Sequence, residues 1–368
     1  MKILYVTTIG ITMGFFKELI KQLIEEGHTV DIATNESDSK VPELYRELGC
    51  KIYQLSCCRS PFRKENLTAV REIKKLVEEN HYDIVHCHTP IAAVCTRFAC
   101  QKVRKSGTRV FYTAHGFHFY KGAPLVNWLV YYPVEWLCAH FTDVLITINK
   151  EDYARARKHM HAKRVEYVPG VGIDVEKFAN VQVDRAAKRR EIGVPEDATV
   201  LISVGELSKR KNHEIIIKAL SQIENNNIHY LIVGEGSLLQ YLQKCVSEQH
   251  LEQRVHFLGY RKDVAELYKS SDICCFPSIH EGLPVALMEA MASGLPVVCS
   301  KIRGSIDLIN EGEGHLCDTL DTDGFAQAIS CLVEDKELQL KMGKMSKESV
   351  DKYSIETIIK AMNKCMKK

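Results

Sequence analysis

The chain has 368 residues, 45% of them hydrophobic and 26% charged, which is typical of a soluble globular protein with room for two domains. The formal net charge of +2 argues against a nucleic-acid-binding protein, whose binding domain would be strongly basic. No apolar run in the sequence is long enough to span a bilayer. The fourteen cysteines include no C-x-x-C pair and no export signal precedes them, so we expect a reduced, cytoplasmic protein.

The N-terminal part begins as a β-α-β unit. Residues 2–8 form an apolar run that predicts a strand, residues 15–24 have helical periodicity, and residues 29–34 predict a second strand. This order is typical of a parallel sheet. The turn between Gly10 and Gly14 lacks a full G-x-G-x-x-G motif, so it gives weak support for a dinucleotide site.

Three histidines stand at the ends of two later strands. Residues 83–88 predict a strand with His86 and His88 on one face, because alternate residues of a strand point the same way. A metal site would need further ligands that the sequence does not supply at a suitable spacing, so we interpret the two as a packed or cleft-lining polar pair. Residues 111–116 predict another strand that ends at His115. This residue is a candidate functional histidine, since loops after sheet strands often carry function; the alternative is a satisfied surface histidine.

An aromatic segment follows at residues 120–140. It contains Trp128, Trp136, several tyrosines and Lys121. Aromatic anchors beside basic residues are typical of a helix that lies on an anionic membrane surface, whereas a buried pair of helices would explain the same composition equally well. The basic residues upstream are Arg97, Lys102, Arg104, Lys105 and Arg109.

The second half opens with a cationic loop. Residues 164–174 predict a short strand followed by a turn rich in Pro and Gly. Further along, the predicted strand at residues 200–204 leads into Lys209, Arg210 and Lys211. Three consecutive cations at the carboxyl end of a strand indicate an anionic partner such as phosphate. The alternative is a solvated basic loop.

Two further motifs need an interpretation. The predicted strand at residues 229–233 is followed by Gly234 and Gly236, a turn that NAD-linked oxidoreductases use, but Leu239 stands where the third glycine belongs. Asp321 and Asp323 look like a D-x-D metal motif. Because they precede a predicted helix, we interpret them as helix-capping residues and predict no metal.

Two glutamates, Glu281 and Glu289, lie between two buried strands of the second half. The first follows the predicted strand at residues 272–276, and the second lies inside a short helix with Pro284 early in it and Gly294 just past its end. The loop therefore brings Glu281 to the carboxyl edge of a parallel sheet, where ligands bind in open α/β sheets.

This arrangement suits a sugar attached to a diphosphate. A carboxylate accepts hydrogen bonds from two neighbouring hydroxyls, and the free N–H groups around Leu283 to Val285 favour an anion such as a diphosphate. The sequence thus predicts a nucleotide-sugar site. The plainer alternative is that Glu281 caps the helix and Glu289 is solvated.

The spacing around these glutamates resembles the E-x7-E signature of the family-four retaining glycosyltransferases, and it is similar to members that build bacterial capsular, exopolysaccharide and O-antigen units. The resemblance implies an α/β fold of two facing Rossmann-like domains (GT-B). Residues 1–175 would form the acceptor-side domain, residues 176–352 the nucleotide-sugar domain, and residues 353–368 a C-terminal helix that crosses back to the first domain. The residues that carry it are Pro277, Ser278, Glu281, Gly282, Pro284, Glu289, Gly294 and Pro296.

The resemblance also implies a role for individual residues. Glu281 and His115 would contact the donor sugar, Glu289 the ribose, and Lys211 the diphosphate. Glu206 stands where the family usually has Arg, so Arg210 is the expected substitute. Further donor-binding candidates are Gly14, Gly205, Gly259, Tyr260, Gly282, Leu283, Pro284 and Val285.

The implied reaction moves a hexose or N-acetylhexosamine with retention, from a nucleoside-diphosphate sugar (a UDP-sugar by family habit) to a glycan or polyprenyl-diphosphate-linked acceptor. Neither a cofactor nor a metal is expected, and contact with the inner face of the cell membrane through residues 120–140 is a hypothesis. Two alternatives remain at this point: an NAD-linked Rossmann oxidoreductase, and a sugar-nucleotide epimerase or binder of the same fold without transfer activity.

Overall fold

The computed structural model describes residues 1–367, and the final lysine lies outside them. The chain forms two compact units: Met1–Val171 together with Ile358–Lys368, and Gly172–Thr357. It leaves the first unit after Val171 and returns to it within the last helix, α17 (Ile355–Lys367). That helix begins after Ser354, whose Oγ accepts a hydrogen bond from the backbone N–H of Thr357 at 3.3 Å, as expected of a serine cap.

The first unit is built on a seven-stranded sheet in the order β3-β2-β1-β4-β5-β6-β7, and every neighbouring pair is parallel. The predicted strands are all present, and the parallel sheet expected from the β-α-β opening is confirmed. The strands are β1 (Lys2–Ile9), β2 (Thr29–Asn35), β3 (Ile52–Gln54), β4 (Ile84–His88), β5 (Arg109–Ala114), β6 (Val144–Thr147) and β7 (Arg164–Tyr167).

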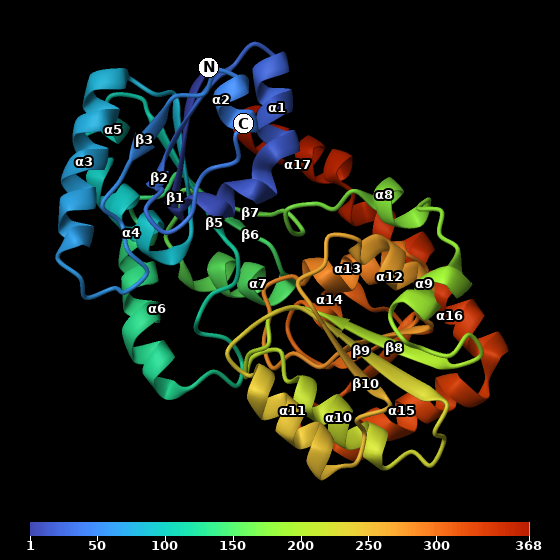
Figure 1. The fold of residues 1–368 in the computed structure, drawn as a ribbon. Helices are drawn as coiled ribbons and strands as arrows, with labels where there is room; N and C mark the ends of the chain where they lie inside the picture. Colours follow the sequence, from blue (N-terminus) through green and yellow to red (C-terminus); the bar gives the residue numbers. More distant parts are fainter. Residues whose placement is uncertain (368) are drawn as a thin grey trace. The chain divides into compact units, whose positions relative to one another are not determined.

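Helices cover both faces of this sheet. α3 and α4 bury small and branched side chains against one face, and α1 lies against the other (Figure 1). The stretch that we predicted as one helix from residue 15 starts as a 3₁₀ turn, η1 (Gly10–Phe16). The helices are α1 (Lys17–Glu25), α2 (Leu44–Glu47), α3 (Glu65–Asn80), α4 (Pro90–Ala99), α5 (Gln101–Lys105), α6 (Leu125–Ala139) and α7 (Lys150–His159).

The second unit repeats the plan with six parallel strands in the order β10-β9-β8-β11-β12-β13. The order reverses between β8 and β11, which makes their carboxyl ends a topological switch point. The strands are β8 (Thr199–Val204), β9 (Ile228–Val233), β10 (Val255–Gly259), β11 (Ile273–Phe276), β12 (Val297–Ser300) and β13 (Gly314–Cys317).

The helices of the second unit also form two layers. α10, α11 and α15 enclose one apolar core with the sheet, while α12 and α13 lie on the opposite face (Figure 1). Both units are therefore doubly wound α/β structures, which confirms the predicted fold class. The helices are α8 (Val175–Ala179), α9 (Arg185–Glu191), α10 (His213–Ser221), α11 (Leu239–Glu248), α12 (Val264–Ser270), α13 (Val285–Ala292), α14 (Ser305–Leu308), α15 (Thr322–Glu334), α16 (Lys336–Ser349) and the 3₁₀ turn η2 (Val350–Tyr353).

The aromatic segment forms a single helix, α6, rather than the buried pair of helices that was one of our two interpretations. Most of its apolar side chains face solvent, with Leu125 80% and Leu129 77% exposed. Of the basic residues upstream, Arg97 is buried and pairs with Glu135 at 2.8 Å, so it does not contribute to a cationic surface. None of the helices within residues 1–367 is long and apolar enough to cross a bilayer.

Candidate functional site

Three loops of the second unit meet at the carboxyl edge of its sheet. They follow β8, β11 and β12 and are joined by hydrogen bonds: the N–H of Ile279 donates to the carbonyl of Arg210 at 2.8 Å, and Nε of Arg303 donates to the carbonyl of Glu281 at 3.0 Å. Gly304, with φ of +84°, lies so close to Gly282 that a Cβ would sit 2.5 Å from its carbonyl oxygen. The glycine is therefore required by the close approach of two loops.

The predicted cations and the predicted carboxylate are in contact. Nζ of Lys211 lies 2.8 Å from Oε1 of Glu281, and Arg210 forms an ion pair with the same oxygen through Nη1. Both Lys211 and Glu281 keep only 12% of their side-chain surface exposed. Two cations share one carboxylate, so the group has an excess positive charge that suits an anionic ligand.

The position of Lys211 is determined by its neighbours. Its methylene chain lies against Gly205, where a Cβ would come within 3.0 Å of Cε. Its ammonium lies 4.7 Å from the centre of the Phe276 ring, a cation–π contact. Gly205 thus has a packing role beside Lys211, which is one physical reason for a glycine at this end of β8.

Helix α13 starts at Val285 and has Pro284 as its N-cap residue. Its first-turn N–H groups are therefore those of Val285, Ala286 and Leu287, two positions later than the stretch from Leu283 to Val285 that we expected. An N-terminal helix end attracts anions. This end belongs to the same loop as Glu281, so it adds to the positive character of this edge.

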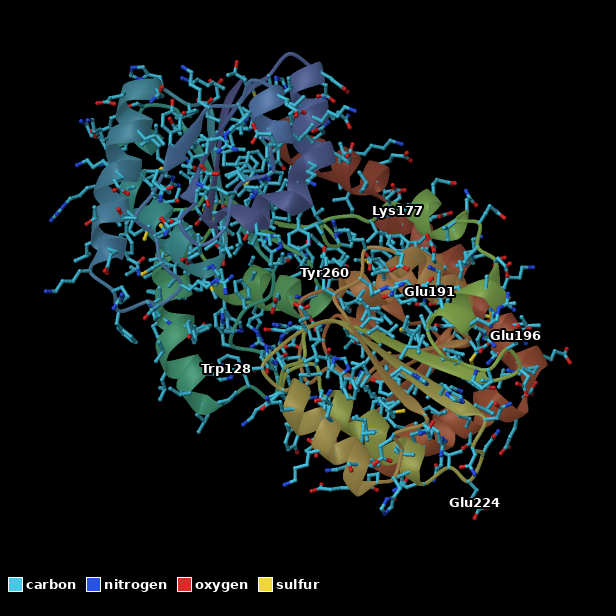
Figure 2. The ribbon with its side chains drawn as sticks, viewed as in Figure 1. Trp128, Lys177, Glu191, Glu196, Glu224 and Tyr260 are labelled. Carbon is cyan, nitrogen blue, oxygen red and sulfur yellow. The ribbon has the colours of Figure 1, made fainter. Side chains whose placement is uncertain are left out.

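Glu289 lies in the second turn of α13 and is half-buried. Burial raises the pKa of its carboxyl to about 7, and the charge of Lys177 on α8 opposes that rise. Figure 2 labels Lys177 on α8. Glu289 is thus a carboxyl that changes charge near neutral pH, which the sequence alone did not indicate.

The remaining predicted donor residues occupy other parts of this edge. The side chain of Glu206 is exposed, and its carboxylate lies outside the ion-pair group around Glu281. Gly259 ends β10, and Tyr260, labelled in Figure 2, is 70% exposed beyond it. Their roles in base binding remain predictions.

The G-x-G turn after β9 has a structural explanation. A Cβ on Gly234 would lie 2.0 Å from the carbonyl oxygen of Gly205, and one on Gly236 would lie 2.4 Å from that of Leu207. Both glycines allow this loop to pack directly on the loop after β8. The motif therefore needs no dinucleotide to account for it.

The first unit brings its three strand-end histidines together. Nδ1 of His88 lies 3.1 Å from Nε2 of His115, and the ring centres of His86 and His88 are 4.2 Å apart. The expectation that His86 and His88 share a face and pack together is confirmed. Phe16 lies against His88 at 4.3 Å, and Tyr5 is stacked on it at 5.6 Å.

Burial keeps these histidines neutral. It lowers the pKa of His115 to about 4 and that of His86 to about 3, with the charge of His115 as a second cause. The pKa of His88 is lowered well below its ordinary value by burial and by its two histidine neighbours. Because Nε2 of His115 is hydrogen-bonded to Nδ1 of His88, Nδ1 is the ring nitrogen that His115 can offer to a ligand.

Thr89, directly after His88, has an unusual backbone. Its φ is +63°, a conformation that a β-branched residue rarely adopts. Thr8 holds it there, since the N–H of Thr8 donates to Oγ1 of Thr89 at 3.0 Å and the two hydroxyl oxygens are 2.7 Å apart. Such strain concentrates at functional sites. Only the tertiary contacts reveal it.

Gly14 and the D-x-D motif can also be placed. Gly14 is an exposed residue of η1 with room for a side chain, whereas a Cβ on Gly10 would collide with Ser39. A donor-binding role for Gly14 remains a prediction.

Asp321 accepts a hydrogen bond from the N–H of Gly324 at 2.9 Å, so its predicted role as a cap of α15 is confirmed. Within residues 1–367 no three His, Cys, Asp or Glu side chains are grouped so that they could hold a metal ion.

Comparisons with family models match both halves of the chain. The model described as "Glycosyltransferase Family 4" matches residues 15–177, and the model described as "Glycosyl transferases group 1" matches residues 184–349. The first match includes the histidine group, and the second includes the ion-pair group around Glu281.

Relatives of similar length carry glycosyltransferase names. EpsD of Bacillus subtilis (strain 168), named as a glycosyltransferase, is 35% identical over 98% of this chain and 95% of its own length. The UDP-Gal:alpha-D-GlcNAc-diphosphoundecaprenol alpha-1,3-galactosyltransferase of Escherichia coli is 30% identical over 81% of this chain and 78% of its own. Among solved structures, HepE of Anabaena in complex with UDP is 20% identical, covers 100% of both chains and has a TM-score of 0.84.

Proposed function

The chain belongs to the family 4 glycosyltransferases of the GT-B fold, and on that premise we propose that it is a retaining enzyme of polysaccharide synthesis. It moves a hexose or an N-acetylhexosamine from a UDP-sugar to a glycan or lipid-linked acceptor. One observation carries the proposal: Lys211 and Arg210 converge on Glu281 at the switch point of a parallel sheet. The two cations suit the phosphates of the donor and the carboxylate suits the hydroxyls of its sugar, and ligands of open α/β sheets bind at this edge.

The transfer reaction separates charge. As the bond between the anomeric carbon and the diphosphate breaks, the sugar becomes cationic and the leaving diphosphate gains negative charge. Lys211, Arg210 and the first-turn N–H groups of α13 are preorganised donors for that anion. Glu281 holds the hydroxyls of the sugar and favours its cationic ring.

We propose that the acceptor hydroxyl attacks from the face that the diphosphate leaves, and that the leaving phosphate oxygen takes its proton. This retains the anomeric configuration. Glu281 already shares its oxygen with two cations, which makes it a weak nucleophile and argues against a covalent glycosyl-enzyme step. The same two cations do the work that a metal ion does on a diphosphate in other enzymes, so activity in excess chelator is expected.

The donor and acceptor classes follow from relatives. HepE of Anabaena has been solved with UDP-glucose, and the Escherichia coli relative is named for a UDP-sugar donor and a diphosphoundecaprenol acceptor. We propose a uridine nucleotide here by analogy. Gly259, Tyr260, Gly205 and Glu289 are the candidates for base and ribose binding, and His115 offers Nδ1 to the sugar.

The exposed helix α6 supports peripheral membrane contact. Its sequence has one charged residue, Glu135, which is buried and neutralised by Arg97. An exposed apolar helix face is typical of an interfacial helix, and a lipid-linked acceptor lies at such a surface. We therefore propose that residues 120–140 contact the inner face of the membrane. Liposomes that fail to retain the protein at any content of anionic lipid would exclude this part of the proposal.

The alternatives differ in products. An epimerase or binder of this fold would release no glycosylated acceptor, and an NAD-linked oxidoreductase would reduce a dinucleotide. The packing of Gly234 and Gly236 on the loop after β8 removes the main support for the latter.

The test is a panel of UDP- and GDP-sugars incubated with polyprenyl-diphosphate-linked sugar acceptors, with and without EDTA. Transfer from one donor, seen as a mass increase of one hexose or N-acetylhexosamine, is the expected result. Donor binding without any transferred product would favour the binder, and a changed free sugar nucleotide would favour the epimerase. The anomeric configuration of the product, read from its NMR coupling constant, tests retention.

A further inference from the structure

A hollow with apolar walls lies in the first unit. It has a volume of about 260 Å³ and lies between α4, α6 and the loop after β5. This exceeds the roughly 150 Å³ of an apolar cavity that admits a benzene-sized molecule. Its walls include Val94, Phe117, Phe119, Val130 and Val134, with Phe62 at one side.

The hollow is continuous with the exposed face of α6. Val130 and Val134 line it and are also 38% and 40% exposed on that helix. Phe62, on the other side, is 87% exposed. A ligand that fills the hollow can therefore continue onto apolar surface rather than into water, which is what a long apolar chain requires.

Several polar groups at the hollow are paired with each other, while Nη2 of Arg97 is buried without a hydrogen-bond partner in the described part of the chain. Oε2 of Glu135 pairs with Arg97 at 2.8 Å, and its Oε1 accepts from the hydroxyl of Tyr112 at 3.1 Å. The guanidinium of Arg97 lies over the Tyr112 ring at 4.2 Å. Because the carboxylate of Glu135 is already paired and the walls are mostly apolar, the hollow suits an apolar chain better than a ligand with many hydroxyls.

The hollow also adjoins the candidate catalytic edge of its own unit. Its wall includes Gly116, Phe117 and Phe119, which directly follow His115 at the carboxyl end of β5. The rings of Phe117 and Phe119 are stacked at 4.7 Å and fix this loop. A molecule whose polar head reaches His115 would thus have its apolar part beside these rings.

We propose that this hollow binds the first isoprene units of a polyprenyl-diphosphate-linked acceptor. The inference rests on the proposed function for the existence of such an acceptor, and adds the place where its chain is held. α6 then has two roles: its outer face lies on the bilayer, and Val130 and Val134 guide the chain from the bilayer into the protein. The apolar contact gives the enzyme selectivity for the lipid as well as for the sugar.

The experiment uses photolabelling of the full-length protein without membranes. The probe is farnesyl diphosphate with a diazirine on its last isoprene unit, and the labelled peptides are read by mass spectrometry. We expect label on peptides that contain Val94, Phe117 to Phe119, or Val130 to Val134. Unlabelled farnesyl diphosphate should compete, while inorganic pyrophosphate and dipalmitoyl phosphatidylglycerol should not.

Two matched double variants sharpen the result. V130N/V134N places two amides at the hollow, and L125N/L129N places the same two amides on the part of α6 that does not line it. The first should lower labelling by about tenfold or more, the loss expected when roughly two buried methylene groups lose their apolar contact. The second should leave it unchanged. Thermal unfolding of both variants checks that α6 is intact.

Equal labelling of the two variants, label spread over the exposed face of α6, or equal competition by the phospholipid would overturn the proposal. So would a dimer, detected by light scattering, that covers Val130 and Val134 and excludes the probe. Binding of UDP is measured in parallel by calorimetry. If UDP and every sugar nucleotide fail to bind while the hollow is labelled, the proposed function is wrong and the isoprenoid site is supported. If nucleotides bind and sugar is transferred without labelling of the hollow, the proposed function is supported and the isoprenoid site is wrong.

Discussion

The carboxyl edges of the two sheets use polar groups in opposite ways. In the second unit, two cations and a carboxylate meet at largely buried side chains, and Lys211 and Arg210 outnumber Glu281. In the first unit, His86, His88 and His115 lie together, and burial holds the pKa of each below its ordinary value. The same topology therefore carries a group with excess positive charge in one unit, which suits a phosphate, and a group of neutral histidines in the other.

That difference suits a reaction with two kinds of partner. A diphosphate needs permanent positive charge, whereas sugar hydroxyls need donors and acceptors that do not change with pH. Charge near the surface costs little to maintain, but an unpaired buried charge is expensive. This explains why the histidine group is neutral and why the charged group is internally paired.

The largest effect is expected in the charged group. Lys211→Ala should lower kcat/KM of transfer by at least about a hundredfold, the usual scale for losing one charge-stabilising group. Lys209→Ala, the exposed neighbour, is the matched control and should retain activity. Wild-type turnover in Lys211→Ala, with normal thermal unfolding, would contradict the assignment.

Glu281 allows a sharper test of the same group. Glu281→Ala should likewise lower transfer by at least about a hundredfold, because the sugar loses its carboxylate. Affinity for UDP itself should be unchanged or higher, because Arg210 and Lys211 are then free to bind phosphate. Calorimetry with UDP separates the two effects, and a loss of UDP binding that parallels the loss of transfer would refute the division of roles.

In the neutral group, His115→Ala is expected to reduce transfer by about tenfold to a hundredfold, the range of one or two lost hydrogen bonds to a polar substrate. His88→Ala should have a smaller effect, because His88 is a positioning residue that orients His115. His88→Asn, whose amide can reach toward His115, should recover part of kcat at similar KM. His140→Ala, which removes an exposed histidine, is the control. An equal loss of activity in the three alanine variants would contradict a specific role for His115.

The acid limb of the pH profile should report Glu289 rather than His115. Burial raises the pKa of Glu289 to about 7, so its carboxylate is lost as pH falls below that value, and nucleotide affinity should fall by up to about tenfold per pH unit there. Glu289→Gln should bind less tightly at pH 8 and show no such fall. A limb near 7 that persists in Glu289→Gln would exclude this residue.

The stability of the fold depends on the protonation of Glu289 in the opposite direction to nucleotide affinity. Since the folded state holds the proton of Glu289 more tightly than the unfolded state, protonation favours folding. Its contribution is fully present below about pH 4.5, the ordinary value, and is lost as pH rises through about 7. The midpoint of urea unfolding should therefore fall between these pH values by more in the wild type than in Glu289→Gln.

The smallest effects distinguish glycines that the fold requires from one that it tolerates. Gly14→Ala has open space around its Cβ and should change the free energy of unfolding by less than about 0.5 kcal/mol. Gly234→Ala collides with the carbonyl of Gly205 and should cost about 2 kcal/mol or more. If Gly14→Ala instead weakens UDP-sugar affinity at unchanged stability, the predicted donor role of Gly14 is supported.

Local patterns in the sequence determined the elements of this protein. Apolar runs predicted the parallel strands, and the capping residue Asp321 predicted the start of α15, because these features depend on neighbours a few residues apart. The positions of Glu281, Lys211 and His115 at carboxyl ends of strands followed from the same reasoning.

Tertiary structure alone decided how those ends meet. The pairing of Arg210 and Lys211 with one carboxylate, the contact of His88 with His115, the strained Thr89 and the half-buried state of Glu289 all join residues from different loops or layers. Their distances, and the pKa values that burial shifts, depend on which strands are neighbours and what covers them. Spacing along the chain does not contain that information. The sequence was therefore enough to identify the candidate residues, whereas their distances and pKa values depend on the tertiary structure.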